Sequence, residues 1–368
     1  MIQDEAVAFL KALVELPSIS GDEHAAVSLL ANKMSGLGLT ATIDDAGNAV
    51  GIREEPGPDG EFSKEIVLLG HIDTVPGNIP VRIEDGKLYG RGSVDAKGPL
   101  ATFLFAAAKT KLHPGTRLVV IGAVEEESAT SKGARFAAGC FRPDYCIIGE
   151  PSGWDGLTLG YKGRLLIDYH LQQPMAHTAG PQTGVAEQAV AWWNRLLAHV
   201  EQHNDGRTGL FDQILPSLRE IHTSSDGINN EVRAKIGLRL PLDFDLDSFT
   251  QEASAWAGAA ALSFYGFEPA FRSKRRSPLV TVFNRVLREE KVRPHLKLKT
   301  GTSDMNVVGP VWQCPTAAYG PGDSLLDHTP QEHIQLAHYV RAIGLLSVVL
   351  SRLSDPNLPG QSGKKRAA

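Results

Sequence analysis

The first part of the chain alternates between helical patterns and short, continuously apolar runs. Residues 1–18 carry apolar side chains at helical spacing, and residues 99–111 have a second helical pattern. The apolar runs at residues 66–69, 118–124 and 145–148 have the length and composition of strands that are buried on both faces. Strands that alternate with helices predict an α/β domain with a mostly parallel sheet.

The middle of the chain has a different period. Residues 164–171 and 232–240 alternate between apolar and polar positions, as half-buried strands do, whereas residues 185–199 and 246–262 have helical spacing. A strand–helix–strand–helix order over about 100 residues predicts a small α+β domain that is inserted into the first one.

The α/β pattern returns after about residue 271. We therefore predict a discontinuous catalytic domain, made of residues 1–162 and 271–368. The inserted residues 163–270 are predicted to form a lid and dimerisation domain. A chain of 368 residues is long enough for two domains, each with its own core.

Local signals mark the starts of two helices and the end of the chain. Ser20 and Glu23 have the spacing of a capping box before a helix that includes Leu30. Pro330 is expected to open a long terminal helix that runs to about residue 353. The segment PGQSGKKRAA, residues 359–368, predicts a disordered tail.

Composition and charge exclude several classes of protein. The formal net charge is −5 and 42% of the residues are hydrophobic, so the chain lacks the basic footprint of a nucleic-acid-binding protein. The apolar runs are short and interrupted, so we expect none to approach the roughly 18 residues of a membrane span. The acidic N-terminal segment does not resemble a secretory signal, and three unpatterned cysteines favour free thiols. We therefore expect a cytoplasmic protein with no membrane or nucleic-acid partner.

Acidic and histidine side chains follow the predicted buried strands. His71 and Asp73 come directly after the first apolar run, two residues apart, and share one face if the strand continues. Asp95 lies between glycines and the start of a predicted helix. Both positions have an ordinary structural alternative, which is a hydrogen bond for the first pair and a helix N-cap for Asp95.

Three further groups extend this set. The glutamates at residues 125–127 end the second apolar run, Glu150 follows the third, and His328 lies near the start of the predicted terminal helix. Adjacent glutamates repel one another unless cations or protons compensate, although a solvated turn is an alternative. Sites in open α/β sheets form at the carboxyl ends of strands. Carboxylate and imidazole ligands together suit zinc, or manganese and cobalt as substitutes.

The order of these motifs resembles the ArgE/DapE/aminoacylase/glutamate-carboxypeptidase superfamily. The chain carries in turn GHIDTVP, GRGSVDAKG, EEESATSKGAR, GEP and DHTP, so the resemblance covers nearly its whole length. It implies a zinc-exopeptidase-like catalytic domain and a zinc-dependent hydrolase that acts on an amide bond. It also implies two Zn²⁺ ions per subunit, for which Co²⁺ or Mn²⁺ can substitute.

The resemblance further implies a role for each residue of the set. His71 and Glu150 would hold one zinc ion, with Asp95 as the bridge between the two ions. His328 and one glutamate of the triplet would hold the other ion. Asp73 would orient His71.

The glutamate triplet can be aligned with the family in two ways. Relatives have Asp-Glu-Glu after the strand, and counting along the apolar run places Glu125 at that Asp. Glu126 is then the general base and Glu127 the zinc ligand. A shift by one residue would make Glu125 the base and Glu126 the ligand. The general base takes a proton from the attacking water and passes it to the leaving amine.

Substrate contacts follow from the resemblance alone. His177 would stabilise the oxyanion, in relatives often from the dimer partner, and an inert loop histidine is the alternative. Gly301 and Thr302 match a substrate-side loop of the family. Arg239 matches a position that binds a substrate carboxylate, although Asp226 stands where relatives usually have Asn. A solvated arginine is the alternative for Arg239.

The segments EEESATSKGAR and GEPSGWDGLTLGYKGR are most similar to the lysine-biosynthesis branch of the superfamily. That branch releases lysine, and in some members ornithine for arginine biosynthesis, from the glutamate tail of a small acidic amino-group carrier protein. The alternatives are an acetylornithine deacetylase, another N-acyl-amino-acid hydrolase or carboxypeptidase, and a metal-free binding protein on the same scaffold. The resemblance also implies a homodimer that forms through the lid.

Residues 272–276 concentrate positive charge in a chain that is acidic overall, since four of the five are Lys or Arg. An acidic protein substrate would need a local basic surface of this kind. The run therefore suggests a docking site for the carrier, and a solvated hinge segment is the alternative.

Overall fold

An inserted unit interrupts the chain of a larger one in this computed structural model, which describes residues 2–177 and 179–358. Unit 1 comprises Met1–Gly160, Ser273–Leu298 and Ser303–Ala368, and unit 2 comprises Tyr161–Arg272 and Lys299–Thr302. The short segment Lys299–Thr302 joins unit 2 although it is remote from the rest of that unit in sequence.

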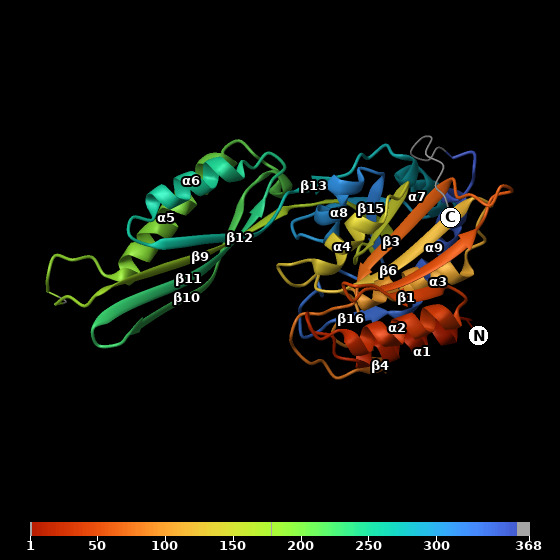
Figure 1. Ribbon diagram of the computed structural model, residues 1–368, viewed down its shortest axis with the longest axis horizontal. Helices are drawn as coiled ribbons and strands as arrows, with labels where there is room; N and C mark the ends of the chain where they lie inside the picture. Colours follow the sequence, from red (N-terminus) through yellow and green to blue (C-terminus); the bar gives the residue numbers. More distant parts are fainter. Residues whose placement is uncertain (1, 178, 359–368) are drawn as a thin grey trace. The chain divides into compact units, whose positions relative to one another are not determined.

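A nine-stranded sheet has its centre in unit 1 (Figure 1). Its strands are β1 (Thr40–Ile43), β2 (Ala49–Glu55), β3 (Lys64–His71), β6 (Thr116–Ala123), β7 (Tyr145–Gly149), β8 (Gly153–Tyr161), β13 (Phe271–Arg272), β14 (His295–Lys299) and β15 (Thr316–Gly320). They lie in the order β1-β2-β6-β3-β7-β15-β8-β13, and β14 also pairs with β8. The central neighbours β6, β3, β7 and β15 are parallel, whereas β1, β2 and β8 pair in antiparallel fashion. The predicted α/β class with a mostly parallel sheet is confirmed.

Helices cover both faces of this sheet because its central strands are apolar on both sides. They are α1 (Ile2–Glu15), α2 (His24–Gly36), α3 (Lys97–Lys109), α4 (Lys132–Cys140), α7 (Pro278–Glu289), α8 (Asp304–Trp312) and α9 (Leu336–Leu353). Ile66 and Leu68 of β3 share a core cluster with α1, α3 and α9. Val67 and Leu69 are equally buried and point to the opposite face, since successive side chains of a strand alternate.

Unit 2 is a four-stranded antiparallel sheet with helices on one face. Its elements are β9 (Gly163–Pro174), α5 (Val185–Asn204), β10 (Leu215–Ser225), β11 (Asn229–Leu240), α6 (Leu246–Trp256), β12 (Ala261–Glu268) and the short 3₁₀ helix Leu210–Asp212. The strand order is β10-β11-β9-β12. Alternate residues of β9, such as Ile167 and Tyr169, pack with Trp192 of α5 in the core of this unit. This alternation is the half-buried pattern that the sequence predicted.

Three local predictions differ from the structure, and one strand was missed. The helix predicted over residues 246–262 ends at Trp256, and its last residues belong to β12. Strand β10 was not predicted, because most of its side chains are exposed and lack an apolar period. Ser20 and Glu23 form no capping box, since no side chain caps α2. Pro330 does not open the terminal helix.

The terminal helix begins at Leu336, after a small sheet in the order β16-β5-β4. This sheet consists of β4 (Arg82–Glu84), β5 (Lys87–Tyr89) and β16 (His333–Gln335). By length and composition alone α9 could cross a membrane, although no such run was expected. Its side chains Tyr339, Leu346 and Leu350 lie in the core of unit 1, and a buried core helix meets the same test.

The three cysteines, Cys140, Cys146 and Cys314, are free, as the sequence predicted. The disordered tail predicted for residues 359–368 lies outside the described residues.

Candidate metal centre

Three neighbouring parallel strands end beside one another, and each is followed by acidic or histidine side chains. His71 is the last residue of β3, the glutamates 125–127 follow β6, and Glu150 follows β7. The sheet order β6-β3-β7 makes these segments neighbours, although they are far apart in the sequence. The carboxyl edge of the sheet therefore collects them, as expected for an open α/β sheet.

The carboxylate of Asp95 lies between two histidines. Its Oδ1 atom is 3.1 Å from Nε2 of His71, and its Oδ2 atom is 3.1 Å from Nε2 of His328. Nε2 of His328 is also 2.9 Å from Oε1 of Glu127. Nε2 of His71 is 3.9 Å from Oε1 of Glu150. The donor atoms thus form two groups of three that share Asp95.

These separations suit atoms that coordinate a common metal ion. Two ligand atoms at 2.0–2.1 Å from a tetrahedral zinc ion are about 3.3 Å apart. Ligand atoms of His71, Asp95 and Glu127 all lie within 4.8 Å of one another. Imidazole nitrogen and carboxylate oxygen are ligands that zinc and related divalent ions accept. The residues therefore fit a divalent metal site.

Asp73 holds the ends of β3 and β6 together. Its carboxylate is fully buried and accepts hydrogen bonds from the backbone N–H groups of Glu126 (3.0 Å) and Glu127 (2.9 Å). The hydroxyl of Ser20 donates a third bond to it at 2.7 Å. Nδ1 of His71 lies 3.0 Å from the Asp73 carbonyl oxygen, so its other ring nitrogen faces Asp95. Asp73 thereby fixes both the imidazole and the glutamate loop.

Asp95 does not cap a helix. The residue that precedes α3 is Ala96, and it makes no side-chain cap. The loop before Asp95 instead passes close to the β3 end. Gly92 has φ +82° there, and a Cβ atom on it would lie 2.7 Å from Cγ2 of Thr74. Gly92 is therefore favoured by its left-handed backbone and by the side chains packed against it.

Glu332 fixes the backbone on which Asp95 sits. Its side chain is fully buried, and Oε1 accepts hydrogen bonds from the N–H groups of Val94 (3.0 Å) and Asp95 (3.2 Å). Oε2 pairs with Nη1 of Arg91 at 2.8 Å. Glu332 also lies four residues after His328. One buried carboxylate thus links the chain segments that carry two candidate ligands.

The three glutamates of the triplet point to different partners. Glu125 has φ +59°, and its carboxylate accepts a bond from Thr130 at 2.6 Å and lies 3.6 Å from Nζ of Lys132. Glu127 lies 2.9 Å from Nε2 of His328, and it belongs with His71 and Asp95 to the candidate metal group. This geometry favours the alignment in which Glu126 is the base and Glu127 the ligand. A left-handed backbone at a non-glycine residue is common at functional sites, and His328 shares this feature at φ +60°.

The site has a strongly negative potential. Burial would lower the pKa of His71, but hydrogen bonds with Asp73 and Asp95 raise it well above its ordinary value. Hydrogen bonds with Asp95 and Glu127 raise the pKa of His328 to about 10. Burial, together with nearby carboxylates, raises the pKa of Glu126 well above its usual range. Such a potential favours a cation, and a bound metal ion would take the place of protons here.

The remaining predicted residues lie in unit 2. Nη1 of Arg239, near the end of β11, lies 2.7 Å from Oγ1 of Thr302, which donates to the carbonyl of Lys162 at 2.9 Å. Gly301 is next to Thr302 in the same returning segment. His177 lies in an exposed loop, where its Nδ1 accepts from the N–H of Ala179 at 3.1 Å. Asp226 closes the turn between β10 and β11 by accepting backbone hydrogen bonds.

The sequence model of peptidase family M20/M25/M40 matches residues 67–352, which includes most of unit 1 and all of unit 2. The chain belongs to this family. It is therefore a hydrolase of the M20 type, in agreement with the resemblance found in the sequence.

Among relatives of the chain, an enzyme of Deinococcus radiodurans named LysW-lysine hydrolase is 45% identical over 355 residues, covering 94% of this chain and 96% of the relative. A metallo-carboxypeptidase of the M20 family from Sulfolobus solfataricus has a similar structure, with a TM-score of 0.78 at 18% identity over 95% of this chain and 99% of the other. The dipeptidase Dug1p of Saccharomyces cerevisiae has a TM-score of 0.79 at 14% identity over 97% of both chains. The two structures support the fold of this M20 chain.

Sequence analysis missed several residues that support the site in this M20 chain. Ser20 was interpreted as a helix cap but binds Asp73, and Glu23 accepts a bond from the N–H of Glu125 at 3.2 Å. Glu332 and Arg91 were not identified at all. The only local signal for Glu332 was its position one turn beyond His328, in a segment expected to be helical. The other contacts join segments that are far apart in the sequence, so no local sequence pattern could indicate them.

Replacing Glu332 with Ala should weaken metal binding without removing a ligand. The substitution leaves the N–H groups of Val94 and Asp95 and the guanidinium of Arg91 without their buried acceptor. We expect the free energy of unfolding to fall by about 1–3 kcal/mol and the affinity for Zn²⁺ to fall by about 10- to 100-fold. Thermal unfolding and calorimetric titration of the metal-stripped protein with Zn²⁺ measure the two effects.

Glu332→Gln is the matched control, since it keeps one acceptor oxygen and the same shape. It should retain more affinity for Zn²⁺ than Glu332→Ala. An unchanged affinity in Glu332→Ala, together with lower stability, would restrict Glu332 to a structural role.

Proposed function

We propose that this chain hydrolyses the amide bond between L-lysine and the glutamate tail of the amino-group carrier protein LysW, as a step of lysine biosynthesis. The observation that carries this proposal is the 45% identity, over nearly the full length of both chains, to an enzyme named for that reaction. The donor set and the base glutamate are intact, which supports an enzyme rather than a metal-free binding protein. The free thiols agree with a cytoplasmic location.

The proposed cofactor is a pair of Zn²⁺ ions. His71, Glu150 and Asp95 would hold one ion, and Asp95, Glu127 and His328 the other, because the donor atoms group in this way. A metal pair supplies Lewis acidity toward the amide carbonyl and lowers the pKa of water. Asp73 would keep the His71 ring in the orientation that leaves Nε2 free for the metal.

Glu126 is the proposed general base. Its backbone N–H donates to Asp73, and its carboxyl group lies near enough to His71, Glu127 and Glu150 for their charges to act on it. A carboxylate at this position would take the proton of the attacking water and deliver it to the leaving amine. One residue then serves as base and acid in turn.

Residues of unit 2 would recognise the amino acid that is released. Arg239 is proposed to bind the substrate carboxylate, because its guanidinium is held against Thr302 and carries a fixed positive charge. Gly301 and Thr302 would contribute a backbone donor and a hydroxyl beside it. His177 is proposed to stabilise the oxyanion of the tetrahedral intermediate.

Substitutions in the glutamate triplet should separate the base from the ligand. Glu126→Gln should keep its metal content but lose about 10²- to 10⁴-fold in kcat, because the proton carrier is lost. Glu127→Gln should lose one metal ion, since a ligand charge is removed. Elemental analysis after zinc reconstitution and steady-state kinetics measure the two effects.

Glu125→Gln is the control for both variants, because Glu125 binds Thr130 and Lys132 instead. It should remain active with full metal content. If Glu125→Gln is the inactive variant with full metal, the alignment is wrong by one residue. A wild-type protein that never takes up more than one Zn²⁺ per chain would contradict the metal pair.

The substrate is tested with three compounds on the zinc-loaded enzyme. LysW-linked lysine should be cleaved with the highest kcat/KM, LysW-linked ornithine more slowly, and N-acetylornithine least well. Free amino acid released over time is the measured quantity. Preference for N-acetylornithine would favour an acetylornithine deacetylase, and efficient release of ornithine would extend the role to arginine biosynthesis.

A homodimer through unit 2 is the proposed assembly. Strand β10 lies at the edge of the sheet, and its exposed residues include Leu218 and Ile221. An exposed apolar edge strand is able to pair with a second copy.

Ile221→Lys should therefore weaken the dimer, which sedimentation equilibrium at micromolar concentration would detect. Leu242→Lys is the control, because Leu242 is also exposed in unit 2 but lies outside the strands. A wild-type protein that is monomeric under these conditions would contradict the proposal.

A further inference from the structure

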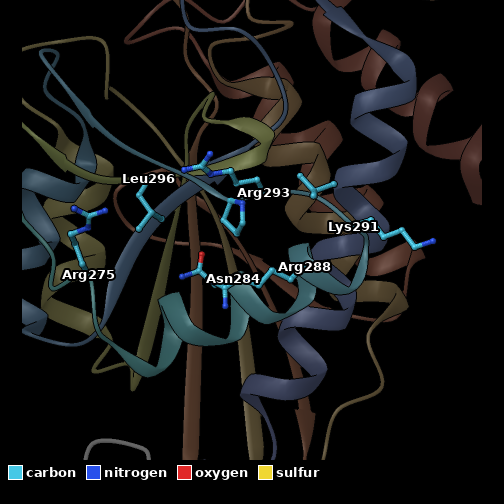
Figure 2. A pocket seen from close by; sticks show the side chains of 8 residues that line it. Arg275, Asn284, Arg288, Lys291, Arg293 and Leu296 are labelled. Carbon is cyan, nitrogen blue, oxygen red and sulfur yellow. The ribbon is translucent and has the colours of Figure 1, made fainter.

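A basic pocket lies in unit 1 at the end of α7, separate from the donor atoms of the metal centre. It has a volume of about 480 Å³ and is lined by Arg275, Asn284, Arg288, Lys291, Val292, Arg293, Pro294 and Leu296. Figure 2 shows Arg293 across the pocket from Asn284 and Arg288, with Arg275 at one end and Lys291 at the other. Of residues 272–276, Arg275 is the one that lines this pocket.

The four cations of this pocket come from two stretches of the chain. Arg275 precedes α7, whereas Arg288 lies in its last turn and Lys291 and Arg293 follow in the loop before β14. Cations at a helix C-terminus have an ordinary explanation, because they complement the helix dipole. Arg275, which precedes the helix, has no such explanation. Convergence of like charges from separate segments indicates a site for an anion.

Nearby acidic side chains do not neutralise this pocket. No acidic residue lines it, and among the described ion pairs none involves its four cations. The adjacent Glu289 and Glu290 are directed to the last helix instead. Glu289 pairs with Arg352 at 3.0 Å, and Glu290 lies 3.6 Å from Arg341. These two glutamates therefore pair with α9, and the pocket keeps its positive charge.

The other lining groups favour an acidic peptide over a small ion. Val292, Pro294 and Leu296 give the pocket an apolar part that suits the methylene groups of glutamate side chains. The Oδ1 atom of Asn284 is buried and has no hydrogen-bond partner among the described residues. A peptide N–H group would satisfy such an acceptor, whereas sulfate has no hydrogen to donate to it.

We propose that this pocket binds a carboxylate-bearing segment of the protein substrate and so docks the carrier on unit 1. The inference rests on the proposed function for the identity of the occupant. The strand that carries Leu296 contacts the segment that follows Glu150. Leu296 precedes Lys297, whose Nζ donates to the carbonyl of Ser152 at 2.9 Å, two residues after Glu150.

Two double variants with the same change in charge test the pocket. The pocket variant is Arg288→Gln with Arg293→Gln, and the control variant is Lys274→Gln with Arg276→Gln, which are exposed cations outside the lining. The pocket variant should raise KM for LysW-linked lysine about tenfold and leave kcat unchanged, because it removes docking contacts only. The control variant should stay within about twofold of the wild type.

The loss in the pocket variant should shrink as salt rises, since exposed charges are screened. Turnover of a small N-acyl-lysine should be the same in the wild type and both variants. If the wild type does not cleave LysW-linked lysine, the proposed function fails. If it does, and both double variants have the wild-type KM, the docking inference fails while the proposed function stands.

Direct binding tests the pocket independently of the reaction. A fluorescein-labelled octaglutamate peptide should bind the zinc-loaded wild type and the control variant with equal affinity, as measured by anisotropy. It should bind the pocket variant about tenfold more weakly. Equal binding to all three proteins would overturn the inference. So would full displacement of the peptide by millimolar inorganic phosphate, because the pocket would then be a site for small anions.

Discussion

The buried carboxylate of Asp73 is the contact on which the candidate site depends. It accepts hydrogen bonds from the backbone of Glu126 and Glu127 and from Ser20, while its main chain orients His71. Strands β3 and β6 are parallel neighbours, so their ends would meet without it. The carboxylate also sets the position of the His71 imidazole on one strand relative to the glutamate loop that follows the other. Positioning of this kind decides whether donor atoms can share a metal ion.

The metal centre concentrates negative charge that the protein alone does not balance. Asp95, Glu126, Glu127 and Glu150 lie close to one another with two histidines. Burial of several carboxylates in one place is costly unless cations compensate. Glu332 adds a further buried carboxylate, but Arg91 and two backbone N–H groups satisfy it. The uncompensated part of the charge is therefore confined to the donor atoms, where a divalent ion would be held most strongly.

Acidic and basic side chains are concentrated in different parts of unit 1, which the net charge of −5 for the whole chain does not indicate. The carboxyl edge of the sheet is acidic, whereas the end of α7 is basic because its glutamates pair with α9. In the proposed function, the acidic edge would hold the metal ions, and the basic pocket would attract and orient the protein substrate before the reaction.

The sequence determined the central sheet and the members of the candidate site. Continuous apolar runs specify strands that are buried on both faces, and the motifs that follow them have a family-specific order. Tertiary structure alone decided how those residues are held. Ser20 meets Asp73 across 53 residues, and Glu332 meets Asp95 across 237. Strand β10 lacked a signal because most of its side chains are exposed. The cation cluster around Arg293 lacked one because Arg275 joins it only in the folded chain. Local patterns encode burial, whereas hydrogen bonds and charge clusters depend on which strands and loops become neighbours.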